Sequence, residues 1–145
     1  MDLDKAYKLS DIYDDVNDEC SYTSVSYHRN GNPQKSQWSI SIDEEFVCFK
    51  TSRLQKWSSQ KRGWGLHPSN KFDEVGKLTD KESVKIARFQ ENSPNNQPIK
   101  DEWHGYPADI RGKKNDIPTD SVLQSWLSKG YINKSQFIRI RRGVL

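Results

Sequence analysis

A run of five residues at positions 103–107, Trp-His-Gly-Tyr-Pro, constrains the fold of this chain more than any other segment. It sets three ring-bearing side chains around a glycine and closes on a proline, which is typical of a sharp turn. We therefore predict a turn that presents aromatic faces and one titratable imidazole at a single place. Such a turn is either a joint that docks the C-terminal part of the chain or a functional site that contains His104.

The composition indicates a folded protein in spite of its polarity. Only 32% of the 145 residues are hydrophobic and the mean hydropathy is −0.99, values that by themselves favour disorder. Five Trp, six Tyr and five Phe supply the large side chains that a disordered chain lacks. We expect a small aromatic core beneath a very polar surface.

Several classes of protein are disfavoured by the sequence. It has no apolar stretch long enough to cross a bilayer, and its acidic start is unlike a signal peptide, so we expect a cytoplasmic protein with no membrane partner. Cys20 and Cys48 are expected to be reduced thiols. The cysteines and histidines lack metal-binding spacing and there is no phosphate-binding glycine loop, so we predict neither a metal nor a cofactor.

The charges are distributed unevenly, although the net charge is only +3. Residues 1–19 carry seven acids and two bases, residues 51–72 carry five bases and no acid, and residues 111–145 carry eight bases and two acids. If the two basic segments share a face, it would attract phosphates or an acidic protein. The alternative is that the acidic segment packs beside the basic C-terminal segment and neutralises it.

The first fifty residues predict one helix and three strands. Apolar residues recur at a helical period over 3–17, whereas period-two alternation predicts strands at 22–27 and 36–42. Turn residues between these strands favour a β-hairpin, and residues 46–49 add a third strand. The expected fold class is α+β, with a small antiparallel β-meander, an N-terminal helix and a helical C-terminal third.

We expect a single domain over residues 1–145, divided into the helix and meander at 1–50, a basic irregular region at 51–78 and a helical part at 79–145. Thr79 and Glu82 resemble a capping box, which predicts a helix over about 80–91. A later helix is predicted by an apolar stripe at helical spacing, formed by Val122, Leu123, Trp126 and Leu127.

The last fifteen residues predict a second C-terminal helix. Gly130 suits the left-handed cap of the preceding helix, and Asn133 and Gln136 resemble another capping box. Residues 137–141 also alternate with period two, so an edge strand is the competing prediction.

Two basic segments suggest a nucleic-acid surface. Residues 53–71 interleave positive charge with tryptophans, the combination that holds single-stranded nucleic acid, and the C-terminal helices have the outline of a helix-turn-helix. The residues that we predict to bind nucleic acid are Arg62, Trp64, Arg139, Arg141 and Arg142. The alternative is that Trp57 and Trp64 belong to the core and that the arginines form a solvated face.

His104 is the candidate catalytic residue, because an imidazole exchanges protons near neutral pH. In a metal-independent ribonuclease it would serve as the base and be combined with a second acid, such as His28 or His67. Such an enzyme would also need a cation such as Arg111 or Lys113 to stabilise the phosphorane. The alternative is that the His104 ring has a structural role and donates a hydrogen bond to a backbone carbonyl.

The last third of the chain resembles a group of short uncharacterised prokaryotic proteins. These share a Trp-His-Gly-Tyr-Pro turn, a proline-started helix with a tryptophan and a glycine turn into a basic helix. The match covers about residues 102–142 and rests on residues 102–107 together with Ile117, Pro118, Trp126, Gly130 and Ile132. The resemblance implies a compact C-terminal unit and a prokaryotic or phage origin, and it implies no activity.

Taken together, the sequence favours a small cytosolic nucleic-acid-binding module over an enzyme. Its partner would be nucleic acid or an acidic protein. One alternative is a protein-interaction factor, such as an antitoxin, immunity or accessory protein. Another is a metal-independent ribonuclease-like toxin that uses His104.

Overall fold

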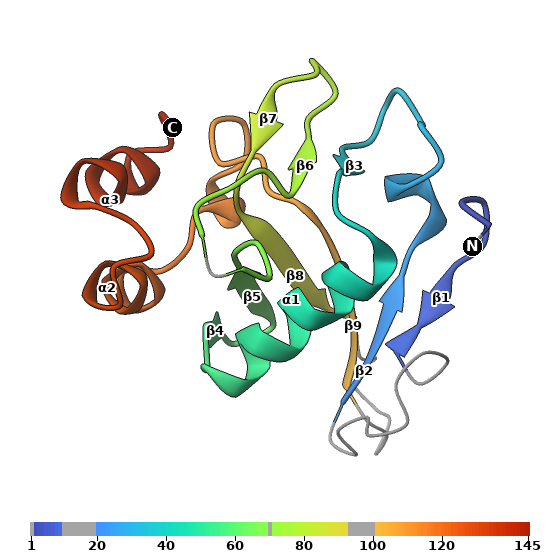
Figure 1. Ribbon diagram of the computed structural model, residues 1–145, viewed down its shortest axis with the longest axis horizontal. Helices are drawn as coiled ribbons and strands as arrows, with labels where there is room; N and C mark the ends of the chain where they lie inside the picture. Colours follow the sequence, from blue (N-terminus) through green and yellow to red (C-terminus); the bar gives the residue numbers. More distant parts are fainter. Residues whose placement is uncertain (1, 10–19, 70, 93–100) are drawn as a thin grey trace.

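A six-stranded mixed sheet with one helix packed on its face organises the fold (Figure 1). The computed structural model describes residues 2–9, 20–69, 71–92 and 101–145. Its main sheet has the strand order β1-β2-β9-β8-β5-β4. The pair β2 and β9 is parallel, and the other neighbouring pairs are antiparallel. The expected α+β class is confirmed.

The strands are mostly short. The main sheet contains β1 (Tyr7–Lys8), β2 (Cys20–Ser24), β4 (Ser58–Ser59), β5 (Arg62–Gly65), β8 (Ala87–Glu91) and β9 (Asp101–Pro107). A second sheet has the order β3-β6-β7 and contains β3 (Gln37–Trp38), β6 (Gly76–Lys77) and β7 (Ser83–Val84).

In the described parts of the chain, three α-helices and two 3-10 helices complete the fold. They are α1 (Ile42–Leu54), α2 (Asp120–Ser128), α3 (Lys134–Arg141), η2 (Ser26–His28) and η3 (Lys114–Asp116). In Figure 1, α1 lies across the sheet, whereas α2 and α3 lie together at the end away from β1. In the part of the chain that the structure describes, no helix is both long and apolar enough to cross a membrane.

The predicted turn at 103–107 is wrong, because this run forms most of the central strand β9. Side chains alternate across a strand. The Trp103 ring therefore packs near Phe49 of α1, with ring centroids 5.8 Å apart, while His104 and Tyr106 face the opposite side of the sheet. Pro107 is the last residue of the strand, where a missing N–H group is tolerated.

The glycine within this strand is required by close approach rather than by a turn. A Cβ atom at Gly105 would lie 2.5 Å from the Phe89 ring and 2.6 Å from the Tyr22 hydroxyl. Both side chains are fully buried, so neither can move aside without disturbing the core. Residues 103–107 thus alternate between side chains that face the core and side chains that face the other side of the sheet.

The predicted third strand at 46–49 is also wrong, because these residues lie within α1. Ser41 and Glu44 form a capping box at the start of this helix, each side chain satisfying the other residue's backbone N–H. Ile42, Phe46 and Phe49 then recur at helical spacing and are buried against the sheet. The spacing of Ser41 and Glu44 indicates a helix start in the sequence, but the β-prone composition of residues 46–49 favoured a strand.

The predicted hairpin between residues 22–27 and 36–42 does not form. β2 is bonded to β1 on one side and to β9 on the other, so it has no free edge for β3. β3 instead pairs with β6. The three-stranded meander is therefore replaced by a sheet in which β2 pairs with β9, a strand about 80 residues later in the chain.

Two predicted helices are contradicted where the structure describes them. Residues 7–8 form β1 rather than part of a helix over 3–17, and residues 10–19 of that prediction lie outside the described residues. The helix over 80–91 is replaced by β7 and β8. β8 bonds to β5 and β9 on its two sides and buries Phe89, an arrangement that outweighs the local signal of Thr79 and Glu82.

The region 51–78 is less irregular than predicted, since it contains the end of α1 and the strands β4, β5 and β6. The C-terminal predictions are confirmed. Thr119 caps α2, Gly130 has φ +76° beyond its end, and Asn133 and Gln136 form the capping box of α3. Residues 137–141 are helical, so the edge strand is excluded.

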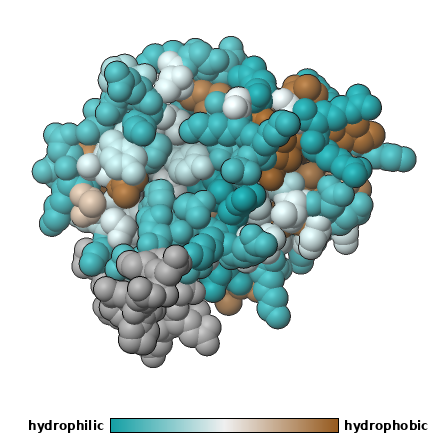
Figure 2. Space-filling view, turned by 180° about the vertical axis from the view of Figure 1, so that it is seen from behind, coloured by the Kyte–Doolittle hydropathy of each residue, from teal (hydrophilic) through white to brown (hydrophobic). Residues whose placement is uncertain are grey.

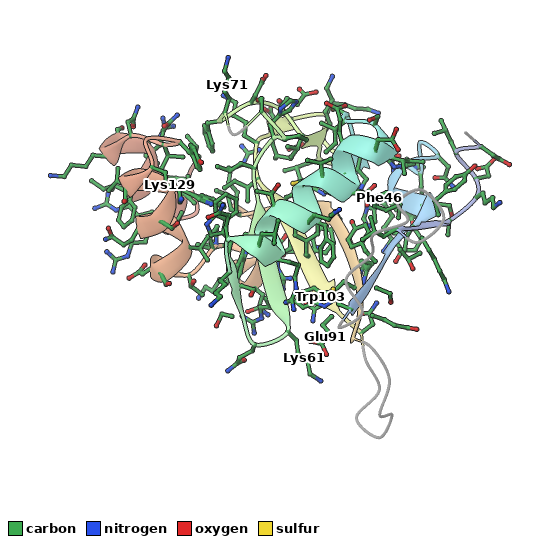
Figure 3. The ribbon with its side chains drawn as sticks, turned by 60° about the horizontal axis from the view of Figure 1, so that its bottom comes forward. Phe46, Lys61, Lys71, Glu91, Trp103 and Lys129 are labelled. Carbon is green, nitrogen blue, oxygen red and sulfur yellow. The ribbon has the colours of Figure 1, made fainter. Side chains whose placement is uncertain are left out.

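The core is rich in aromatic rings, as expected, and the described residues form two clusters in it. The first lies between α1 and the sheet and includes Tyr22, Phe46, Phe49, Phe89 and Trp103. In Figure 3, Phe46 and Trp103 lie in this layer, whereas Lys61, Lys71 and Lys129 extend from the surface. The second cluster joins β5 to α2 and α3 and includes Trp57, Trp64, Leu123, Trp126 and Ile140. Cys20 and Cys48 are both buried and form no disulfide, in agreement with the prediction.

A buried ion pair ties α1 to the segment that follows β2. Glu45 is fully buried and Arg29 is 7% exposed, and their charged groups lie 2.7 Å apart. The Glu45 carboxylate also accepts hydrogen bonds from the hydroxyls of Tyr22 and Ser24, and Arg29 donates to the Ile40 carbonyl at 2.9 Å. This network fixes the position of η2, whose last residue directly precedes Arg29.

Removing either partner of this pair should destabilise the protein strongly, because the remaining charge stays buried and unpaired. We expect Arg29→Ala and Glu45→Ala each to lower the free energy of unfolding by about 3–5 kcal/mol. The loss in the double variant should be smaller than the sum of the two. Urea unfolding measures all three values.

The exposed ion pair between Arg141 and Asp120, 3.2 Å apart and about 60% exposed on both sides, provides the matched control. Arg141→Ala should lower stability by less than about 1 kcal/mol. If the double variant lost as much free energy of unfolding as the Arg29→Ala and Glu45→Ala losses added together, the two side chains would not be energetically coupled. Glu45→Gln keeps most of the hydrogen-bonding shape, so it supplies a milder variant if the alanine variants do not fold.

Candidate active site

A cleft of about 430 Å³ brings together residues from five separate parts of the chain. It is lined by η2, by residues 34–36, by residues 78–79, by the outer face of β9 and by the segment around η3. Figure 2 views the molecule from the side opposite α1, where the surface is largely hydrophilic and the hydrophobic area gathers toward α2 and α3. The ionisable and aromatic side chains among its lining residues are Tyr27, His28, Lys35, His104, Tyr106, Asp109, Lys113 and Asp116.

Two of the three histidines meet in this cleft. The ring of His28 stacks on Tyr106, with centroids 5.5 Å apart and an interplanar angle of 22°. On the other side, His104 lies two residues before Tyr106 on the same face of β9, with ring centroids 6.4 Å apart. Tyr106 thus stands between two imidazoles that are 76 positions apart in the sequence.

His28 presents an unprotonated nitrogen. Its Nδ1 lies 2.8 Å from the Ser36 carbonyl oxygen, which can only accept, so a neutral ring carries its proton on Nδ1 and leaves Nε2 as an acceptor. Burial lowers the pKa of His28 to about 4 and outweighs the hydrogen bond to Ser36, which acts in the opposite direction. At neutral pH this ring is therefore a neutral base.

His104 has the opposite arrangement. The Asn92 side-chain nitrogen lies 2.6 Å from its Nδ1, and an amide nitrogen can only donate, so the neutral ring carries its proton on Nε2. Burial and, secondly, the charge of Arg88 lower the pKa of His104. Since an amide offers both a donor and an acceptor, rotation of Asn92 would also satisfy the protonated ring.

Tyr106 is fixed by a buried carboxylate. Its hydroxyl donates to Asp116 Oδ1 at 2.8 Å, and Asp116 Oδ2 accepts from the backbone N–H of Asp109 at 2.8 Å. Burial and the Asp116 charge raise the pKa of Tyr106, so its hydroxyl stays protonated. Arg88 lies 3.7 Å from Asp116 but is 2% exposed and is held by backbone carbonyls of Asn115 and Phe89, so it supports the site from within.

Among the described residues, two lysines at the rim are the cations that line the cleft. Lys113 Nζ lies 5.6 Å from the centre of the Tyr106 ring, and Lys35 Nζ lies 5.4 Å from the centre of the Tyr27 ring. Both lysines are exposed. The site therefore pairs two imidazoles with positive charge at its entrance, a combination suited to a phosphate ester.

Several predicted site residues lie in the cleft and others do not. His104, His28 and Lys113 line it, whereas Arg111 does not. His67 lies 3.9 Å from Glu44 on α1, on the other side of the sheet. The sequence reasoning did not single out Tyr27, Lys35, Asn92 or Asp116, because each belongs to a different segment and no local motif marks it.

The predicted nucleic-acid-binding residues are dispersed. Trp64 is 1% exposed and donates to the Asp116 carbonyl, so its ring is not available to a base. Arg62 lies on β5 and pairs in register with Gln90 of β8, which in turn pairs with His104 of β9. Arg62 therefore lies on the same face of the sheet as His104. The exposed arginines of α3 and its C-cap, Arg139, Arg141 and Arg142, do not line the cleft.

Among the residues that the structure describes, no three His, Cys, Asp or Glu side chains are grouped so as to hold a metal ion. The chain matches no protein-family model, no curated protein and no solved structure. The resemblance to short prokaryotic proteins thus stays a hypothesis.

The buried state of His28 predicts how stability varies with pH. An unfolded histidine binds its proton near pH 6.5, whereas folded His28 binds it near pH 4. Between these values the unfolded state holds more protons, so the free energy of unfolding should rise with pH by about 3 kcal/mol. Urea unfolding at intervals from pH 4 to pH 7 measures this increase.

His28→Asn is the matched variant, because the asparagine amide can replace Nδ1 as donor to Ser36 but does not titrate. It should lose this part of the pH dependence. A His28 pKa near 6.5, measured by NMR titration of the folded protein, would contradict the assignment.

Proposed function

We propose that this protein binds single-stranded RNA in the cleft and cleaves it by general acid–base catalysis. The observation that carries the proposal is the pair of imidazoles that flank Tyr106, each held at Nδ1 by a different partner. In the neutral ring of His28, Nε2 is a proton acceptor, whereas Nε2 of His104 carries a proton whether that ring is neutral or protonated. Cleavage of an RNA phosphodiester needs both a proton acceptor and a proton donor.

In the proposed reaction, His28 Nε2 removes the proton from a ribose 2′-hydroxyl. The 2′-oxygen forms a bond to the adjacent phosphorus, and the bond from phosphorus to the 5′-oxygen of the next nucleotide breaks. Protonated His104 donates its Nε2 proton to that leaving oxygen. The products are a 2′,3′-cyclic phosphate and a free 5′-hydroxyl, and a second proton exchange restores both rings.

The roles of the two rings follow from their environments. His28 is only 7% exposed, has a pKa near 4 and is neutral when it must accept a proton. His104 is less buried, and a bound phosphodiester adds a negative charge that favours its protonated form. Lys35 and Lys113 supply positive charge where the pentacovalent phosphorus would carry additional negative charge.

RNA rather than DNA is the proposed substrate, because the nucleophile is supplied by the substrate's own 2′-hydroxyl. No side chain then has to act as a nucleophile. The open cleft and hydrophilic surface around it suit a flexible single strand, whose bases and phosphates are accessible. The proposal has two separable parts, the binding of single-stranded RNA in the cleft and its cleavage there.

Replacement of either histidine should slow cleavage strongly and leave RNA binding intact. We expect His28→Asn and His104→Asn to lower kcat on a single-stranded RNA oligonucleotide by about 10²–10⁴-fold, the usual contribution of a general acid or base. The reaction is run with excess EDTA, and mass spectrometry identifies the 2′,3′-cyclic phosphate. Circular dichroism checks that both variants are folded.

His67→Ala is the matched control, because His67 lies beside α1 and should leave kcat unchanged. A substrate with a single 2′-deoxyribose at the cleavage position should resist cleavage. The pH profile of kcat/KM should be bell-shaped, with its acidic limb near pH 4 set by His28 and its alkaline limb, below pH 6.5, set by His104. Equal activity of wild type and both histidine variants would overturn the catalytic proposal.

The salt dependence of RNA binding distinguishes the cleft from α3. We expect Lys35→Ala and Lys113→Ala each to reduce the slope of log K against log salt by about 0.7, the value for one contact with a single-stranded phosphate. Arg139→Ala and Arg142→Ala should leave the slope unchanged. Fluorescence anisotropy with a labelled oligonucleotide measures each slope, and the reverse pattern would place the binding surface on α3.

A further inference from the structure

Tyr27 presents an aromatic ring to solvent at the rim of the cleft. Its side chain is 39% exposed, and its ring centroid lies 4.8 Å from that of His28. We infer that Tyr27 is a stacking platform for the nucleobase of the ribose that His28 deprotonates. This inference rests on the proposed function and assigns a second subsite to the same cleft.

The exposure of this ring is unusual for the protein. The described residues include six large hydrophobic side chains that are exposed, and the other five are aliphatic: Leu3, Val47, Leu54, Ile138 and Val144. Most of the described aromatic rings belong to the two core clusters or pack against them. Tyr27 belongs to neither cluster, so core packing does not account for its position.

The face of the Tyr27 ring already contacts a cationic side chain of the protein. Lys35 Nζ lies 5.4 Å from the ring centre, and both residues line the cleft. An exposed cation–π contact is weak, whereas a base stacks more favourably on an aromatic ring. A base would therefore displace the lysine, whose flexible stem allows its ammonium to move to the adjacent phosphate.

The backbone beneath the platform is held in place. The Gln37 side-chain amide donates to the Tyr27 carbonyl at 2.8 Å and accepts from the N–H of Gly31 at 2.9 Å. Arg29, two residues later, is anchored to buried Glu45. The ring is thus presented by a fixed segment, which lowers the entropic cost of stacking.

The position also fits the proposed chemistry. Tyr27 is next to His28 in sequence and in contact with it, so a base on this ring would bring its own ribose toward the catalytic imidazole. Gln34 also lines the cleft, and a glutamine amide offers a donor and an acceptor to a base edge. Because stacking itself tolerates any base, we expect a requirement for unpaired bases and only a weak sequence preference.

The test measures binding in the absence of cleavage. In the His104→Asn background, a labelled single-stranded RNA hexamer is titrated and its anisotropy is recorded. We expect Tyr27→Ala to weaken binding about tenfold and Tyr27→Phe to bind as the parent does. Leu54→Ala, which removes an exposed side chain on α1, is the control and should have no effect.

A duplex of the same sequence should be insensitive to Tyr27→Ala, because its bases are already stacked on one another. Unchanged affinity of Tyr27→Ala for the single strand would overturn the platform. If the wild type cleaves RNA while Tyr27→Ala has the same KM, the subsite is wrong and the catalytic proposal stands. If Tyr27 governs binding but no product forms, the platform is supported and the catalytic proposal fails.

Discussion

The buried contact between Arg29 and Glu45 is the interaction on which the arrangement of this protein depends. Two charges taken out of water are tolerated only when each is paired and its remaining hydrogen-bonding groups are satisfied. Glu45 meets this condition through Arg29, Tyr22 and Ser24. Because these groups come from α1, β2 and the segment after β2, the contact fixes the helix, the sheet and η2 relative to one another. His28 is the residue next to Arg29 and is placed by the same contact.

The strand β9 joins this core to the candidate active site. One face of the strand carries Trp103 and a glycine that allows the rings of Tyr22 and Phe89 to approach. The opposite face carries His104 and Tyr106. Since alternate residues of a strand point in opposite directions, five consecutive residues contribute to the aromatic core and to the cleft together. The alternation of side chains along β9 therefore connects the packing of the core to the positions of the cleft residues.

Burial shapes the electrostatics of the cleft. It favours the neutral form of both imidazoles, and the separate partners of His28 and His104 give the two rings different proton positions. Asp116 holds the Tyr106 hydroxyl between them. The exposed lysines at the rim provide positive charge without entering the packed interior. Positive charge thus lies at the exposed rim, while hydrogen bonds hold the imidazoles in fixed positions within the cleft.

The sequence by itself determined the α+β class, the aromatic core, the reduced cysteines and the C-terminal helices α2 and α3. These helices were predictable because their caps and apolar stripe involve residues no more than four positions apart. Only the tertiary structure decided that residues 103–107 are a central strand, that 46–49 are helical and that 87–91 are a strand. It alone brought His28 to His104, although the sequence had named both as candidates. The physical reason is that strand pairing and the Arg29–Glu45 contact join residues far apart in the chain, and the free energy of those contacts outweighs local preferences.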